Sequence, residues 1–171
     1  MLFVTLFRTT ITTPIGKMIA VADEAYVYML DFLDDISMQA KMAFLQTKAK
    51  KQVEEGSLPL FDQLKKELDL YFKGRLQNFS LPIFSFGTVF QQRVWQELRA
   101  IPYGTTNSYA QIASSMGEPL ATRAAANANG KNKLAILIPC HRVIQSDGRI
   151  GGYNGGIERK RELLALEGVF L

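Results

Sequence analysis

The only cysteine and the only histidine of this chain are neighbours, Cys140 and His141. The thiolate is the nucleophilic form of cysteine, and a nearby imidazole or cation lowers the pKa of a thiol. Pro139 precedes the pair and Arg142 follows it. These residue types predict a reactive thiol at this point, while a small buried side chain is the common alternative for a lone cysteine.

A regular strand would point consecutive side chains to opposite faces and keep Cys140 and His141 apart. Either the backbone turns sharply after Pro139, or a water links thiol and imidazole. The imidazole also needs an acceptor for its other ring nitrogen, to hold one tautomer. Glu167 is the best candidate, because it shares the apolar face of the last expected helix, where an unpaired carboxylate is costly. A solvated glutamate at a helix end is the alternative.

The composition is that of a globular protein, with 171 residues, 47% hydrophobic and 21% charged. No apolar run is long enough to span a bilayer and the N-terminus does not resemble a signal peptide, so we expect no membrane association. A single cysteine excludes an internal disulfide and favours the cytoplasm. Structural zinc needs four Cys or His ligands, so no metal site is expected.

The positive charge lies in one half of the sequence. Residues 1–84 hold ten Lys and Arg against ten Asp and Glu, and residues 85–171 hold ten against six, which gives the whole net charge of +4. A polyanionic partner for the second half is one interpretation, and a mildly basic surface is the other.

The first half reads as strands followed by helices. Three β-rich runs separated by turn residues predict an antiparallel meander over 2–11, 17–22 and 26–32. Helical spacing follows over 36–52 and 59–73, with a polar join at 54–57. Leu81-Pro82 and Gly87 indicate a boundary, so we expect an N-terminal α/β domain over 1–84 and a second domain over 85–171.

The second half reads as capped helices. Thr88–Gln91 and Ser108–Gln111 each fit a capping box, which predicts one helix to about Ile101 and another to about Met116. A third, alanine-rich helix is expected over 120–129 after a glycine-containing turn, which describes a helix-turn-helix or a plain helical hairpin.

A buried strand is expected next, over 134–138, because its residues are apolar on both faces. It would deliver Cys140 at its end. A glycine-rich loop follows over 148–156, and a terminal helix over 157–167 is closed by Gly168.

The segment Pro139-Cys140-His141-Arg142-Val143 resembles the active-site signature of the O6-alkylguanine-DNA alkyltransferases, also called methylated-DNA–protein-cysteine methyltransferases. Further segments fall in the family's order and spacing: Pro102–Thr106, Ser108-Tyr109, Arg123-Ala124, Asn132, Gly151–Tyr153 with Gly155-Gly156, and Leu163-Leu164 with Glu167-Gly168. The resemblance covers essentially all of 88–168. Residues 1–84 fit only in size and in the order of strands before helices.

This resemblance implies an α+β or α/β fold of two small domains. The N-terminal one would hold an antiparallel three-stranded sheet with helices, ribonuclease H-like, and the C-terminal one would be mostly helical, with the helix-turn-helix and the active-site cysteine. The implied activity is DNA repair by direct reversal: one irreversible transfer of an alkyl group from O6 of guanine, and often from O4 of thymine, to Cys140. The implied partner is double-stranded DNA containing O6-alkylguanine, entered through the minor groove with the base flipped. No cofactor is required, and the expected state is a monomer with possible cooperative assembly on DNA.

The resemblance also implies roles for single residues. Cys140 would be the acceptor, His141 a base acting through a water, Glu167 its orienting carboxylate, and Asn132 a hinge between the alanine-rich helix and the active-site strand. Arg123 would fill the space of the flipped base and Tyr109 would crowd its 3′ phosphate. The other expected contacts to DNA or the base are Tyr153, Asn154 (serine in many members), Ala135, Lys160 (stiffening the loop of Tyr153) and Arg142.

Two other classes of function remain at this point. One is a lesion sensor or helix-turn-helix regulator without transfer activity, although members that only sense lesions lack the reactive cysteine that this chain keeps. The other is a thiol redox protein, which would lack a second cysteine for a disulfide within the chain.

Overall fold

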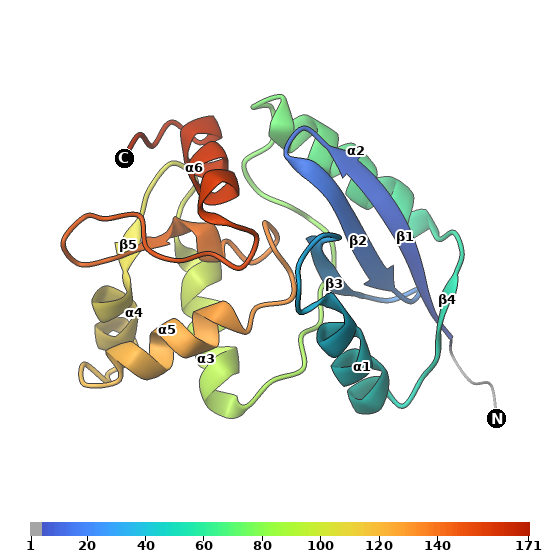
Figure 1. Ribbon diagram of the computed structural model, residues 1–171, viewed down its shortest axis with the longest axis horizontal. Coiled ribbons are helices and arrows are strands. Elements are labelled where there is room, and N and C mark those ends of the chain that lie inside the picture. The colour runs from blue at the N-terminus through green and yellow to red at the C-terminus, as the bar shows by residue number, and fades with distance from the viewer. Residues whose placement is uncertain (1–4) are drawn as a thin grey trace. The chain divides into compact units, whose positions relative to one another are not determined.

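The computed structural model describes residues 5–171, which form two compact units that meet in sequence at Phe86 and Gly87 (Figure 1). The start of the first expected strand, residues 2–4, lies outside the described residues. In the described part, no helix is long and apolar enough to cross a membrane.

The first unit is built on the predicted antiparallel meander. Its strands are β1 (Leu6–Thr13), β2 (Gly16–Ala22) and β3 (Val27–Phe32), and β2 pairs with both neighbours. Residues 18 to 22 of β2 are all buried, as expected of a central strand that is covered on both faces. The three-stranded antiparallel sheet predicted from the sequence is therefore confirmed.

A fourth strand, β4 (Val53–Glu55), extends this sheet in the order β3-β2-β1-β4. It runs parallel to β1, with Val53 opposite Leu6, where the sequence indicated only a polar join. The correction has a simple physical reason. β4 is short and largely exposed, so it carries no alternation of apolar residues and forms only because the edge of β1 offers backbone partners.

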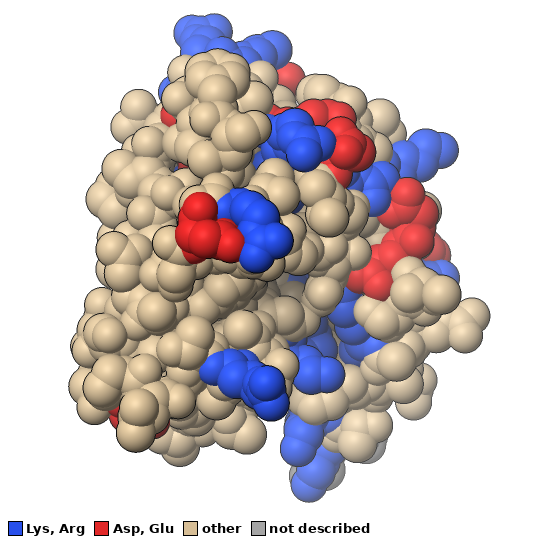
Figure 2. All heavy atoms as spheres, turned by 60° about the vertical axis from the view of Figure 1, so that its left-hand side comes forward, with Lys and Arg blue, Asp and Glu red and all other residues tan. Residues whose placement is uncertain are grey.

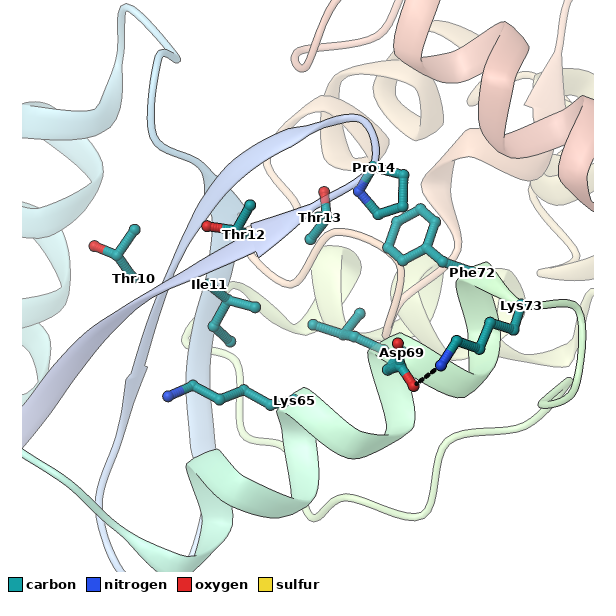
Figure 3. Close-up of a pocket in the computed structure, with 10 residues that line it drawn as sticks. Thr10, Ile11, Thr12, Thr13, Pro14, Lys65, Asp69, Phe72 and Lys73 are labelled. Atoms are coloured by element: carbon teal, nitrogen blue, oxygen red, sulfur yellow. Dashed lines mark hydrogen bonds and ion pairs between the residues drawn. The ribbon is translucent and has the colours of Figure 1, made fainter.

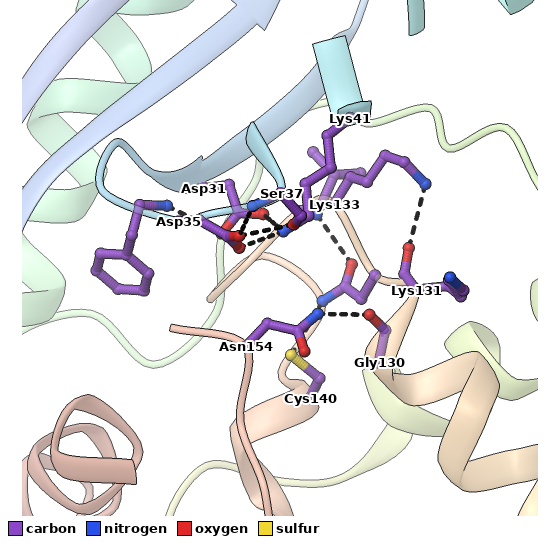
Figure 4. A network of polar contacts seen from close by, with 12 residues as sticks. Asp31, Asp35, Ser37, Lys41, Gly130, Lys131, Lys133, Cys140 and Asn154 are labelled. Atoms are coloured by element: carbon purple, nitrogen blue, oxygen red, sulfur yellow. Dashed lines mark hydrogen bonds and ion pairs between the residues drawn. The ribbon is translucent and has the colours of Figure 1, made fainter. Parts of the chain in front are cut away.

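Two helices complete the first unit, α1 (Met38–Ala49) and α2 (Pro59–Phe72). Leu45 of α1 packs with one face of the sheet in a core cluster of Leu6, Ile19, Val21 and Met29. Where β3 leads into α1, the Lys41 ammonium pairs with the carboxylates of Asp31 and Asp35 (Figure 4). This ion cluster satisfies a charge that the fold buries.

A groove of about 350 Å³ lies between β1 and α2 (Figure 3). Its lining residues come from the end of β1, the following turn and the last turns of α2: Thr10, Ile11, Thr12, Thr13, Pro14, Lys65, Leu68, Asp69, Phe72 and Lys73. The Lys73 ammonium lies 2.7 Å from the Asp69 carboxylate on the groove wall, and both side chains are more than half exposed, which makes this a weak surface pair.

The second unit begins with the capped helices that the sequence predicts. α3 (Val89–Ala100) and α4 (Tyr109–Ser115) both start with complete capping boxes, at Thr88 and Ser108. α5 (Thr122–Gly130) begins two residues later than expected, after a turn in which the Ala121 amide donates to the Glu118 carbonyl. α4 packs against α5, and α3 packs against both, so the pair forms the predicted helix-turn-helix.

The expected strand over 134–138 is wrong, because these residues form a buried series of turns instead. The Ile138 amide donates to the Leu134 carbonyl at 2.8 Å, and Ile136 has a φ of 70°, which is not compatible with extended backbone. The apolar residues at every position of 134–138 suggested a strand covered on both faces. They are buried because the segment forms a compact loop in the core of the unit. The side chain of Asn132 closes it at both ends, accepting from the Leu134 amide and donating to the Ile138 carbonyl.

A short parallel pair, β5 (Asn107–Ser108) with β6 (Val143–Ile144), brings the start of α4 beside the segment that follows Cys140. The sequence did not indicate this pair, since two residues are too few to show a periodicity. The unit ends with α6 (Ile157–Leu166), and Gly168 closes the helix with a φ of 85°, as predicted.

Candidate active site

Cys140 opens a single turn of 3₁₀ helix, Cys140–Arg142, that directly follows Pro139. The backbone therefore turns after the proline, which is the first of the two arrangements that the sequence left open. Successive residues of a 3₁₀ helix are about a third of a turn apart, so Cys140 and His141 are not forced to opposite sides. The thiol is 7% exposed, and the Asn132 amide nitrogen lies 3.2 Å from its sulfur.

His141 is completely buried and lies 2.8 Å from Glu167, joined through Nε2 to Oε1. A carboxylate only accepts, so Nε2 carries the proton and Nδ1 is left as an acceptor. Nδ1 has no hydrogen-bond partner among the described residues. The hydrogen bond expected between Glu167 and His141 is present, and it fixes the tautomer in which the second ring nitrogen can take up a proton.

Arg142 corrects one expectation, because it is buried and does not face a DNA surface. Its Nε and Nη2 donate to the two oxygens of Glu167 at 2.8 and 3.0 Å, and its Nη1 donates to the Ile101 carbonyl at 2.7 Å. In such a bidentate pair the guanidinium uses most of its N–H donors within the protein, so few remain to bind another group. Arg142 therefore neutralises the buried Glu167 and orients it toward His141.

Burial lowers the pKa of His141 below its ordinary value of 6.5, and the bond to Glu167 opposes this only in part. The folded protein thus keeps His141 neutral while the unfolded chain gains a proton as the pH falls below about 6.5. We expect the free energy of unfolding to drop in this range by up to ~1.4 kcal/mol per pH unit. Urea unfolding at pH 7 and pH 5 measures it. Because no other histidine exists, His141→Gln should lose this slope, and equal slopes in both proteins would contradict the assignment.

Lys160 is the second correction, since its side chain is fully buried in the unit and so makes no DNA contact. Its Nζ donates to the carbonyls of Val143 at 2.6 Å and Gly152 at 3.1 Å. Burial lowers the pKa of this lysine to about 8, and attraction to the thiolate form of Cys140 opposes the shift. Lys160 ties the glycine-rich loop to β6, which agrees with the loop-stiffening function that the resemblance implies.

The remaining expected residues lie around this centre. Tyr109, half-buried at the start of α4, has its pKa raised by burial and then by the charge of Cys140. Ala135 is buried in the turns before Cys140, and Tyr153 is half-buried in the glycine-rich loop. Asn154 is exposed, and its Nδ2 donates to the Gly130 carbonyl at 2.5 Å (Figure 4).

The exposed face of the helix-turn-helix carries Arg123, which projects from the first turn of α5 among alanines. Figure 2, in which this side of the molecule is turned forward, shows mostly uncharged surface on which basic and acidic side chains form several separate groups.

Trp95 is a structural residue of this site that the sequence reasoning missed. The indole is 2% exposed and donates to the Ala128 carbonyl of α5 at 2.9 Å. It therefore fixes the C-terminal end of α5 to α3. The signal was available, since Trp95 is the only tryptophan and lies next to the apolar stripe of its helix.

Two family models match the chain, one in each unit. Residues 6–84 match the ribonuclease-like domain of 6-O-methylguanine DNA methyltransferase, and residues 89–169 match the DNA binding domain. The chain belongs to this family.

Relatives of the family align over nearly the whole chain. The methylated-DNA–protein-cysteine methyltransferase of Mycobacterium leprae is 41% identical over 91% of this chain and 88% of its own length. That of Methanosarcina barkeri is 39% identical over 95% of this chain and 97% of its own.

Solved structures of the family share the fold. The Mycobacterium tuberculosis protein OGT in complex with DNA has a TM-score of 0.82 and 39% identity, covering 94% of this chain and 92% of that one. The O6-methylguanine-DNA methyltransferase of Pyrococcus kodakaraensis has a TM-score of 0.72 and 25% identity, covering 96% and 100%. The two-domain fold class predicted from the sequence is thus confirmed.

Proposed function

We propose that this protein repairs DNA by transferring the alkyl group of O6-alkylguanine to the sulfur of Cys140 in a single turnover. The observation that carries the proposal is the arrangement around the only thiol, which receives a hydrogen bond from Asn132 and directly precedes a buried, neutral His141 held by Glu167. The names of the relatives support the same activity.

The reaction begins with loss of the thiol proton. In the proposal, a water passes this proton from Cys140 to Nδ1 of His141, while Glu167 stabilises the imidazolium that forms. The Asn132 amide, 3.2 Å from the sulfur, stabilises the thiolate. Glu167 remains ionised because Arg142 holds its two oxygens.

The thiolate then attacks the alkyl carbon, forming a carbon–sulfur bond as the bond from carbon to O6 breaks. The electron pair of that bond passes to the guanine, which becomes neutral by gaining a proton from the Tyr153 hydroxyl. The Tyr153 oxygen regains a proton from water, and the imidazolium of His141 releases its extra proton to water, so both side chains end neutral. A thioether has no good leaving group, so the alkyl group stays on the protein. O4-alkylthymine contains the same alkyl–oxygen bond and is included as a second substrate of the proposal.

Access to the lesion requires a base outside the duplex, since the thiol is buried. We propose that α5 enters the minor groove, which is about 6 Å wide, because its alanines present little bulk there. Arg123 fills the vacated position in the stack and Tyr109 contacts the 3′ phosphate of the flipped nucleotide. The family structure solved with DNA supports a DNA-bound state.

We also propose a division into two domains, with 85–171 as the DNA-binding and catalytic alkyltransferase domain and 1–84 as the N-terminal α/β domain. The family matches over 89–169 and 6–84 support this proposal. The proposed working form is a cytoplasmic monomer that can assemble cooperatively on DNA. A lesion sensor without transfer activity is not favoured, because the reactive thiol and its hydrogen-bonded neighbours are present.

A titration tests the single-turnover claim. With increasing duplex containing O6-methylguanine, the repaired guanine should rise to one equivalent per protein and then stop. A plateau well above one equivalent would show regeneration of the thiol. No repair at any ratio, with the duplex still bound, would favour the sensor.

A further inference from the structure

Strand β1 of the first unit has a partner strand along only part of its outer side. β1 runs from Leu6 to Thr13, but β4 pairs only with its first three residues, Leu6 to Arg8. Among residues 5–171, no other strand lies on this side of β1, since the order of the sheet is β3-β2-β1-β4. Residues 9–13 therefore form an open sheet edge, a surface to which an extended peptide can add as a further strand.

The pairing of β1 shows which backbone groups point out of this open edge. The Leu6 amide and the Arg8 carbonyl both hydrogen-bond to backbone beside β4, at 3.1 and 3.3 Å, so the even-numbered residues turn these groups toward the outer side. Successive residues of a strand turn them to opposite sides, and β1 keeps one register with β2 along its length. The N–H and C=O of Thr10 and Thr12 therefore point outward from the open edge.

The groove between β1 and α2 runs along this open edge (Figure 3). Its lining includes five consecutive residues, 10–14, and side chains that follow one another in a strand point to opposite faces. The groove therefore follows the edge of the strand and is not confined to one face of the sheet. Ile11, Leu68 and Phe72 give it apolar surface, so side chains of an added strand can be buried there.

The sequence of the open edge lacks the features that usually prevent pairing with another chain. Residues 9–13 read Thr-Thr-Ile-Thr-Thr, with no charged residue and with proline only after the strand, at Pro14. Edge strands are commonly protected by charged side chains, prolines or bulges, and the register of β1 with β2 shows no bulge here. All five residues are β-branched, which favours extended backbone. The open edge therefore favours pairing with an added strand.

The charged residues that line the groove are Lys65, Asp69 and Lys73 of α2 and its end. Lys65 is exposed and makes no ion pair within the described part of the chain, and the pair of Lys73 with Asp69 is a weak surface pair. Two cations against one anion favour a partner that carries carboxylates. A second copy of this chain is disfavoured, because it would bring a second set of the same lysines.

We propose that the open edge and the groove beside it bind an extended, acidic peptide segment of a partner protein, which adds to the sheet as a strand. The N–H and C=O of Thr10 and Thr12 pair with the backbone of this peptide. Alternate side chains of the peptide enter the apolar groove, and a carboxylate lies beside Lys65. The first unit thereby gains a docking function that is separate from the alkyl transfer proposed for Cys140.

The probe is a fluorescein-labelled peptide of alternating valine and glutamate, blocked at both ends and about six residues long, the usual length of a strand. It is titrated with the whole protein and followed by fluorescence anisotropy. We expect saturable binding that weakens as salt is added. The same peptide methylated on its backbone nitrogens lacks hydrogen-bond donors and should not bind. A peptide of alternating valine and lysine should bind at least about 5-fold more weakly.

Two substitutions at one position separate the backbone of the edge from its side chain. Thr12→Pro removes an outward N–H but no hydrogen bond of the sheet, since proline is tolerated on an edge strand when its nitrogen faces solvent. Loss of one hydrogen bond predicts binding about 2- to 10-fold weaker. Thr12→Val keeps the N–H and the branched shape, so this matched control should bind like the unchanged protein.

Two neighbouring lysines of α2 test the charge of the groove. Lys65→Gln should weaken binding of the valine–glutamate peptide about 1.5- to 5-fold and reduce its dependence on salt. Lys66→Gln removes the same charge next to it on the helix, at a residue that does not line the groove, and should have no effect.

Failure of the valine–glutamate peptide to bind at about millimolar concentration would overturn the proposal. So would equal binding of the methylated peptide, or equal losses in Thr12→Pro and Thr12→Val, because the backbone edge would then not be the contact. A peptide-free dimer that Thr12→Pro dissociates in sedimentation would identify a second copy as the occupant and would also overturn it. Thr12→Pro should repair O6-methylguanine like the unchanged protein, which shows that it folds, and the methylated peptide tests the same contact without any substitution.

Discussion

Cys140→Ser abolishes alkyl transfer while leaving lesion DNA bound. A serine hydroxyl holds its proton far more tightly than a thiol, so the water and His141 have no comparably acidic group to deprotonate. The substitution removes no charge and little volume from a residue that is 7% exposed, so we expect the dissociation constant for the duplex to stay within about two-fold. Single-turnover assays and fluorescence anisotropy measure the two quantities on one preparation.

Cys140→Ala is the matched control, since it removes every nucleophilic atom at this position. It should also bind DNA and transfer nothing. Residual transfer in the serine variant but not in the alanine variant would indicate slow attack by the hydroxyl. Transfer in both would mean that the acceptor is another residue, and that the chemistry assigned to this turn is wrong.

Glu167→Ala is expected to cost stability as well as activity. Among residues 5–171, Glu167 is the only acidic partner of the buried Arg142, and breaking a buried pair by removing one partner costs ~3–5 kcal/mol. The same substitution removes the hydrogen-bond partner of His141 Nε2, so the imidazole is no longer held in one tautomer. We therefore expect a large fall in the free energy of urea unfolding together with slower transfer.

A second variant separates the charge from the packing. In the double variant Arg142→Met with Glu167→Leu, both charges are removed together, so no unpaired ion remains. Its loss of stability should be smaller than the sum of the single losses, as expected for residues in direct contact. A loss below about 1 kcal/mol in Glu167→Ala would contradict the account of this cluster.

Local signals predicted much of the second unit. The capping boxes at Thr88 and Ser108 depend on residues three apart, so the sequence alone identified the starts of α3 and α4. Gly168 marked the end of α6, because glycine readily adopts the positive φ that closes a helix C-terminus. The meander of the first unit was also predictable, because its strands are long enough to show their apolar character.

Features that depend on distant partners were not predictable. β4 and the β5–β6 pair exist only through strands far away in sequence. The composition of residues 134–138 is typical of a strand. The segment forms turns instead, because the side chain of Asn132 hydrogen-bonds to the backbone at both of its ends. Arg142 and Lys160 are cations that would normally face solvent, and the fold instead gives them Glu167 and backbone carbonyls as buried partners.

The central claim is that one alkyl group moves from guanine in DNA to one sulfur. Intact mass spectrometry with peptide mapping, after incubation with duplex DNA containing O6-methylguanine, tests it most directly. The account predicts the added mass of a single methyl group, located on the peptide that contains Cys140, and unmodified guanine in the DNA. An unchanged protein mass with the duplex still bound, or a methyl group on any other residue, would contradict it.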